Sequence, residues 1–176
     1  MNAQLEKQFA QLEDHRKMLF NDLKKYSDEV LNKKPSADAW SVTEVMNHLM
    51  ASEGASLRYL QKKTLDTSKA QKAGLKGAWK LFLLKAAFTI PYKFKAPEVV
   101  EPSHEFASLA DSEKKWTHIR TETYKLLNGL KDADHEKEIW KHAFGGKMNI
   151  YQMFDFFDFH FIRHKKQIER TLKSVT

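Results

Sequence analysis

The sequence predicts an all-α fold: a four-helix bundle of the up-down-down-up type, with a long crossover connection between the second and third helices. Three observations lead to this prediction. Apolar residues recur along four long segments at the spacing of one helix face. Glycine and proline are scarce, at 6 and 4 of 176 residues, which favours long uninterrupted elements. No stretch of useful length alternates apolar and polar residues as a half-buried strand does.

The first predicted helix runs from near the start of the chain to about residue 32. Apolar residues recur on one of its faces at spacings of three, four or seven, namely Leu5, Phe9, Leu12, Leu19, Leu23 and Tyr26. Pro35 sets the end of this helix, because a proline disfavours helical backbone at the residue before it. We therefore expect one continuous helix that ends in the region of residues 32–34.

The second predicted helix begins at a capping box and ends near Lys63. Ser41 and Glu44 are spaced so that each side chain accepts a backbone N–H at the start of the helix. One stripe of this helix carries Val45, His48, Leu49, Ser52, Ser56, Tyr59 and Leu60. The stripe predicts that His48 and Ser52 face the interior of the bundle.

Residues 66–104 are predicted to form the crossover connection and to carry a small lid. Residues 66–77 are polar, residues 79–88 favour a short amphipathic helix, and Pro91, Pro97 and Pro102 interrupt the stretch that follows. A helix that lies on a membrane surface is the alternative, and we favour the lid because the lysines are few. The apolar cluster at residues 78–90 is broken by lysines and is shorter than the roughly 20 apolar residues of a membrane span.

The third and fourth helices are predicted in the second half of the chain. The third begins near residues 109–112 and ends at Asn128-Gly129, with a stripe of Leu109, Trp116, Ile119, Thr123, Leu126, Leu127 and Leu130. Residues 131–146 are predicted to be a loop. The fourth helix runs from about Lys147 almost to the terminus, with a stripe of Ile150, Met153, Phe154, Phe157, Phe161, Ile168 and Leu172. Residues 1–176 are therefore expected to form a single domain.

Composition narrows the classes of function. The absence of cysteine excludes disulfides, thiolate metal sites and cysteine nucleophiles, and it suits a cytoplasmic protein. The first residues contain no apolar run of the kind found in secretory signals. Lysine and arginine exceed the acids by 30 to 23, but the lysines are scattered among acids. We therefore expect a solvated surface, without a nucleic-acid or membrane partner.

Histidine is the informative excess, at 8 residues. His160 and His164 stand four residues apart, and both fall on the apolar stripe of the fourth helix, so they are expected to point inward. A buried imidazole must be neutral or paired, and one metal ion would satisfy both rings. His48 would complete a three-histidine set, the arrangement that leaves open positions for a substrate or water. Spacing alone leaves open the alternative that each histidine is hydrogen-bonded separately.

Polar residues near these histidines are candidates for holding a ligand or contacting a substrate. Gln167 follows His164 along the same side of the fourth helix, and Ser52 shares a face with His48. Glu44 and Glu53 flank His48. The helix cap is one role for Glu44. The alternative for either glutamate is that its carboxylate accepts a hydrogen bond from an imidazole N–H.

Arg120 falls on the inward side of the third helix. It is expected either to meet an anionic substrate or to pair with a carboxylate, and we favour pairing. The remaining histidines at element ends are expected to be solvated, namely His104, His135 and His142. The sequence contains no G-x-S-x-G, G-x-G-x-x-G, P-loop or H-E-x-x-H motif, and it does not carry Glu-x-x-His on two helices as di-iron bundles do.

Three stretches resemble a known family. The sequence WSVTEVMNHL at residues 40–49 resembles the second-helix motif of the DinB-like superfamily, the DinB/YfiT-type metalloenzymes. Residues 142–148 (HAFGGKM) and 159–168 (FHFIRHKKQI) resemble the last helix of that family and the loop before it. Residues 94–120 also look similar. The resemblance therefore covers nearly the whole chain.

The resemblance implies a four-helix bundle, often dimeric, that holds a divalent metal ion. The metal would be nickel, zinc, iron or manganese, bound by three histidines that match His48, His160 and His164. Relatives include thiol-dependent transferases that use bacillithiol or mycothiol, and maleylpyruvate isomerase. The implied function is a metal-dependent S-transferase or hydrolase acting on a small electrophile, with a low-molecular-weight thiol as a candidate partner. The alternative is a non-catalytic protein that binds a metal or a small molecule.

Overall fold

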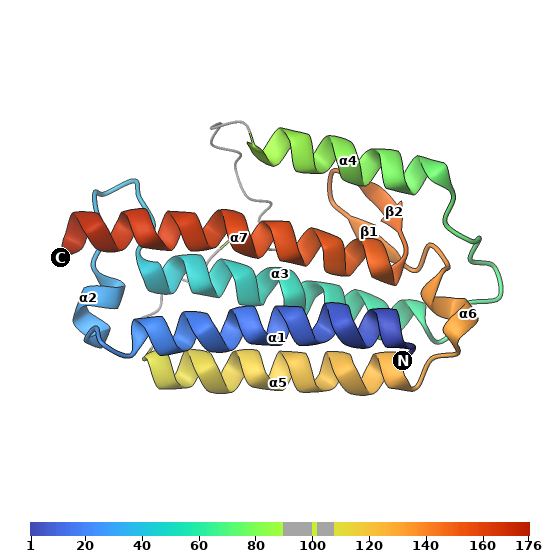
Figure 1. Cartoon of the computed structure of the whole chain (residues 1–176), viewed down its shortest axis with the longest axis horizontal. Coiled ribbons are helices and arrows are strands. Elements are labelled where there is room, and N and C mark those ends of the chain that lie inside the picture. Colours follow the sequence, from blue (N-terminus) through green and yellow to red (C-terminus); the bar gives the residue numbers. More distant parts are fainter. Residues whose placement is uncertain (90–99, 102–107) are drawn as a thin grey trace.

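The computed structural model describes residues 1–89, 100–101 and 108–176, and it is mostly helical, as predicted. Its long helices α1 (Ala3–Leu23), α3 (Val42–Lys63), α5 (Leu109–Asn128) and α7 (Ile150–Val175) lie side by side (Figure 1). α1 packs on α5 and α7, and α3 packs on the same two helices. α1 and α7 run in one direction while α3 and α5 run in the other (Figure 1).

The first predicted helix is divided in two, which corrects the expectation of one continuous helix. α1 ends at Leu23, and a separate helix α2 follows at Asp28–Asn32. The Ser27 side chain caps α2 by accepting a hydrogen bond from the backbone N–H of Val30. Asp28 and Glu29 in the first turn complement the positive end of the helix dipole, so the local sequence itself favours a new start.

The second correction is a β-hairpin in the segment predicted to be a loop. After the short helix α6 (Asp132–His135), strands β1 (Trp140–His142) and β2 (Gly146–Met148) pair antiparallel, with Trp140 opposite Met148. Gly146 has a φ of 74°, a backbone conformation that favours glycine. Helix α7 then begins at Ile150, where Asn149 and Gln152 form a second capping box.

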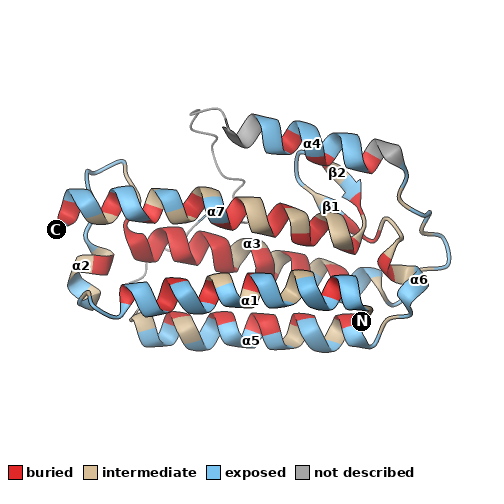
Figure 2. Ribbon diagram, viewed as in Figure 1, coloured by how far each residue is buried: buried red, intermediate tan, exposed pale blue. Residues whose placement is uncertain are grey.

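The core lies between the long helices. Figure 2 shows buried residues on the helix sides that face one another, and the burial is most continuous on α3. Residues 41–50 are all buried, and α3 as a whole packs on α2, α5 and α7. Trp116 of α5 is fully buried and belongs to one apolar cluster, which includes Met46 and Phe161. The start of α3 therefore places its polar side chains, His48 included, inside the protein.

The short helix predicted at residues 79–88 is present as α4 (Leu75–Thr89). It packs on α7 and β2, and it buries Leu81 and Leu84. The predicted proline-punctuated stretch at Pro91, Pro97 and Pro102 lies outside the described residues. Among the residues that are described, no helix is long and apolar enough to cross a membrane.

Candidate metal centre

Helices α3 and α7 bring three histidines together inside the protein. His48 lies on α3, and His160 and His164 lie one turn apart on α7. One ring nitrogen from each lies within 4.8 Å of the others, and the three residues are only 5–7% exposed. The Nε2 atoms of His48 and His160 are 3.2 Å apart. In the part of the chain that is described, no carboxylate joins this group.

Two of the rings have their orientation fixed by a hydrogen bond from the nitrogen that faces away from the group. His48 Nδ1 lies 2.7 Å from the carbonyl oxygen of Val100, which can only accept, so His48 donates through Nδ1–H. His164 Nδ1 lies 2.9 Å from Gln167 Oε1 and donates in the same way when the amide oxygen faces it. A neutral ring protonated at Nδ1 carries its lone pair at Nε2. Both rings therefore present Nε2 lone pairs.

Burial keeps the three imidazoles neutral. Burial lowers the pKa of His164 to about 3, with a smaller contribution from His48. It holds the pKa of His160 well below its usual range, and the neighbouring histidines add to this effect. Burial also lowers the pKa of His48, and the Val100 carbonyl opposes this shift in part. Neutral imidazole is the form that binds a metal ion.

The spacing and chemistry of these rings fit a divalent metal ion. Tetrahedral coordination with metal–nitrogen bonds of about 2.0–2.1 Å places the ligand nitrogens roughly 3.3 Å apart. The Nε2 atoms of His48 and His160 already have this spacing. The ligand nitrogen of His164 lies within 4.8 Å of the other two, so a small side-chain movement would bring it to the same spacing. Without an ion, His160 Nε2–H satisfies the 3.2 Å contact by donating to His48. The residues present therefore fit the metal implied by the sequence resemblance.

Aromatic rings flank the histidines. Trp40 lies beside His48, with ring centroids 5.2 Å apart. Phe156 stacks on His160 at 5.0 Å, with an angle of 19° between the ring planes. These rings place apolar surface beside the histidines, and a lower local polarity strengthens electrostatic interactions.

The polar candidates Glu44 and Ser52 make hydrogen bonds or ion pairs to other groups in the structure. Glu44 closes the capping box on the Ser41 backbone N–H at 2.8 Å and also pairs with Lys34 at 2.8 Å. Ser52 is half-buried, and its carbonyl accepts a hydrogen bond from the Ser56 hydroxyl. Val100, which was not among the predicted residues, holds the imidazole N–H of His48 instead.

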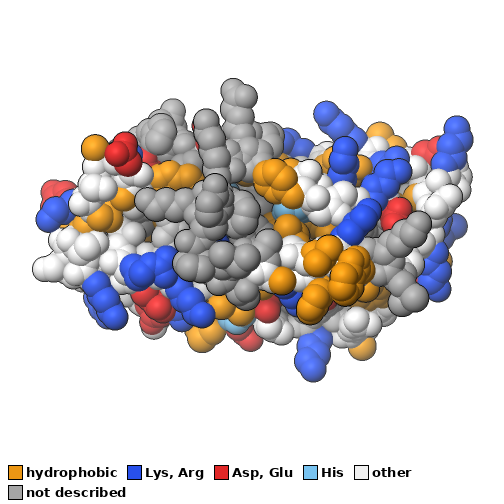
Figure 3. All heavy atoms as spheres, turned by 90° about the horizontal axis from the view of Figure 1, so that it is seen from above, with side chains coloured by type: hydrophobic (Ala, Val, Ile, Leu, Met, Phe, Trp, Pro, Cys, Tyr) orange, Lys and Arg blue, Asp and Glu red, His pale blue; other side chains and the backbone are white. Residues whose placement is uncertain are grey.

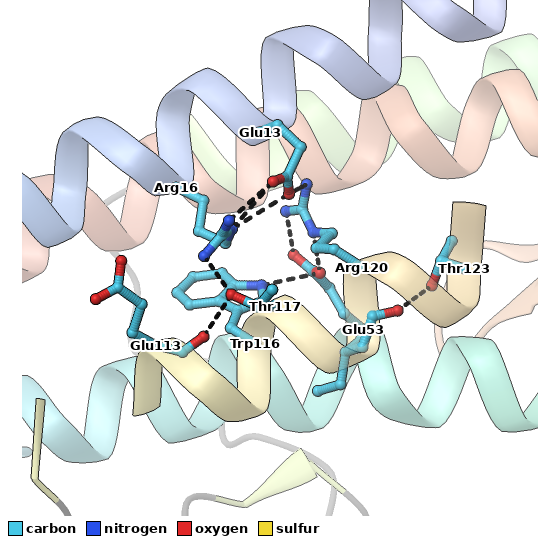
Figure 4. A network of polar contacts seen from close by, with 9 residues as sticks. Glu13, Arg16, Glu53, Glu113, Trp116, Thr117, Arg120 and Thr123 are labelled. Atoms are coloured by element: carbon cyan, nitrogen blue, oxygen red, sulfur yellow. Dashed lines mark hydrogen bonds and ion pairs between the residues drawn. The ribbon is translucent and has the colours of Figure 1, made fainter. Parts of the chain in front are cut away.

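Arg120 forms a buried ion pair, the alternative favoured from the sequence. Its Nε and Nη2 donate to the two oxygens of Glu53 at 2.6 and 2.7 Å (Figure 4). Trp116 Nε1 donates to the same carboxylate at 3.0 Å, and Glu13 of α1 lies 3.4 Å from the guanidinium. The network joins α1, α3 and α5. Both carboxylate oxygens of Glu53 accept hydrogen bonds within this network, so Glu53 is not the partner of an imidazole N–H.

Two histidines expected to be solvated are not. His135 is fully buried, and its Nε2–H donates to the carbonyl of Leu127 at 3.0 Å. His142 of β1 is half-buried, and burial lowers its pKa to about 4. Its ring lies 4.5 Å from that of Phe156, which stacks on His160. Gly145-Gly146 indicates a turn in the sequence, but the strands of the hairpin that positions His142 were not predicted, and His104 lies outside the described residues.

The metal-free protein is expected to lose stability as the pH falls below about 6.5. Burial lowers the pKa of all three histidines, so the unfolded chain binds more protons than the folded protein below their ordinary pKa of 6.5. Each histidine then costs up to about 1.4 kcal/mol of stability per pH unit. Urea unfolding of metal-free protein at pH 7.5, 6.5 and 5.5 measures this. His164→Gln should flatten the profile, and equal stability of the unsubstituted protein at all three pH values would contradict the burial of neutral rings.

Comparisons with known proteins show the family of this chain. The family model of the DinB superfamily matches residues 11–168, a range that includes all three histidines. The chain is also 30% identical over 156 residues to the uncharacterized protein YuaE of Bacillus subtilis (strain 168). That match covers 89% of this chain and 91% of YuaE. The chain therefore belongs to the DinB superfamily.

Proposed function

We propose that this protein is a divalent-metal-dependent enzyme whose ion is held by His48, His160 and His164. The observation that carries the proposal is the convergence of three buried imidazoles within 4.8 Å. A divalent ion bound there supplies Lewis acidity, which lowers the pKa of a thiol or water that occupies an open position. The substrate class we propose is a small electrophile, attacked by that thiol or by water.

The chain's own residues prepare the site for this chemistry. The Val100 carbonyl and Gln167 keep two rings in the tautomer that presents Nε2. Trp40 and Phe156 place apolar surface beside the rings. In the transferase reaction the thiolate sulfur forms a bond to an electrophilic carbon, the leaving group departs with its bonding electrons, and the thiol proton passes to solvent.

We propose that α1, α3, α5 and α7 form the four-helix bundle of the superfamily as one domain, with the α3–α5 connection as its crossover. The packing of each long helix on two others supports this. A homodimer in the cytoplasm is part of the same proposal, and the lack of cysteine is compatible with that location.

A panel of thiols and electrophiles tests the enzyme class. The protein is loaded separately with nickel, zinc, ferrous iron or manganese and assayed with bacillithiol, mycothiol or water against a haloarene and a panel of activated esters. We expect turnover that needs a metal ion and that falls at least 100-fold in His164→Ala. Stoichiometric metal binding without turnover for any combination would favour the alternative, a protein that binds a metal or small molecule without catalysis.

A further inference from the structure

Helix α4 exposes apolar side chains on the face that points away from the protein. Trp79, Phe82 and Leu83 are 61%, 58% and 49% exposed. The rings of Trp79 and Phe82 stack on each other, with centroids 5.5 Å apart and 24° between their planes. The opposite face already buries Leu81 and Leu84. Since the packing of α4 on α7 does not use the outer aromatic face, this face is available to a partner.

Lysines border this outer face. Lys80 and Lys85 are exposed on α4, with the Lys85 ammonium 5.4 Å from the centroid of the Phe159 ring on α7, and residues 75–89 contain no aspartate or glutamate. The Lys80 amine lies beside Gly146 of the neighbouring hairpin. Lys141 and Lys147 are also exposed on that hairpin. Figure 3 looks onto this side and shows hydrophobic side chains gathered over α4, with lysine side chains beside them.

The charges distinguish between possible occupants of the face. A second copy of the chain in a twofold contact would bring Lys80 and Lys85 close to the lysines of the other copy. An anionic lipid surface places phosphates opposite those lysines and accepts the aromatic rings at the boundary between headgroups and acyl chains. Tryptophan and lysine suit that boundary, because each combines an apolar body with a polar end.

We propose that α4 docks this protein on the surface of an anionic phospholipid bilayer. Trp79, Phe82 and Leu83 enter the headgroup region, while Lys80 and Lys85 contact lipid phosphates, which for Lys85 replace the contact with the Phe159 ring. The association is peripheral, and the helix lies in the plane of the surface. From the sequence alone we favoured a lid, because the lysines are few; the structure adds an aromatic face that α7 does not cover.

Vesicle binding tests the proposal, with intrinsic fluorescence as a local probe. Trp116 and Trp140 are buried and Trp40 is half-buried, so Trp79 is the tryptophan whose surroundings change most on docking. The full chain is titrated with vesicles of phosphatidylcholine alone or with 30% phosphatidylglycerol. We expect a blue shift and co-sedimentation with the anionic vesicles only, both weakened by salt. Trp79→Phe should keep most of the binding and lose the shift.

Substitutions on α4 separate docking from adventitious adsorption. Trp79→Ala/Phe82→Ala and Lys80→Glu/Lys85→Glu should each lower partitioning at least tenfold. Met18→Ala, which removes an exposed apolar side chain from α1, should leave it unchanged, with helical content checked by circular dichroism. Equal binding by these variants, or no preference for anionic vesicles, would overturn the proposal. A concentration-dependent dimer that Trp79→Ala/Phe82→Ala dissociates would also overturn it, in favour of a second copy.

Discussion

His160→Ala is expected to abolish stoichiometric binding of a divalent metal ion. The unsubstituted protein should bind about one equivalent of zinc or nickel after dialysis, and the variant less than about one tenth of that. The reason is that the protein supplies three imidazole ligands, and the variant keeps only two of them. The remaining coordination positions are open to water or substrate, so no other protein group replaces the lost ligand. Elemental analysis together with protein concentration gives the ratio directly.

A matched control separates loss of a ligand from loss of a histidine. His118→Ala removes an exposed imidazole from α5 and should keep full metal content. His160→Gln preserves more of the side-chain volume and should lose the metal as His160→Ala does, which excludes a cavity effect as the cause. Equal metal content in the unsubstituted protein and in His160→Gln, with both folded, would remove His160 from the site.

Arg120→Met is expected to lower the free energy of unfolding by about 3–5 kcal/mol. Glu53 is 7% exposed, and in the variant its carboxylate loses the guanidinium that contacts both of its oxygens (Figure 4). From α5 it then keeps only the hydrogen bond donated by the indole N–H of Trp116. Removing one partner from a buried ion pair is costly because the remaining charge is uncompensated. Urea denaturation measures the change.

Two further variants show whether the loss comes from the unpaired charge. Glu53→Leu/Arg120→Met removes both charges and should recover much of the stability, because no buried ion remains. Glu122→Gln breaks an exposed pair with Lys125 on the same helix and should leave the stability nearly unchanged. If Arg120→Met had no more effect than Glu122→Gln, the network would not contribute to the packing of α3 against α5.

The long helices were predictable because their signals are local. The Ser41–Glu44 capping box gave the start of α3, and the apolar stripe gave its end near Lys63, where the structure also ends it. The break between α1 and α2 was missed, although Ser27 followed by two acids is a helix-start pattern. The β-hairpin was missed because strands of three residues are too short to show an alternating pattern.

The neighbourhood of the histidines depends on contacts between distant parts of the chain. The stripe of α7 indicated that His160 and His164 point inward, and the stripe of α3 did the same for His48, so their juxtaposition followed from helix packing. The hydrogen bond from His48 to Val100 could not be predicted, because any residue supplies a backbone carbonyl. Likewise, no local pattern pairs Glu53 with Arg120, which lies 67 residues further along.

The coordination sphere of the bound ion tests the central claim most directly. X-ray absorption spectroscopy of the zinc-loaded protein should show three imidazole nitrogens at about 2.0–2.1 Å, with the remaining position filled by a water molecule or another exogenous ligand. His164→Ala should reduce the imidazole count or leave no bound zinc to measure. A zinc environment dominated by carboxylate oxygens, or one unchanged by His164→Ala, would contradict a centre built from His48, His160 and His164.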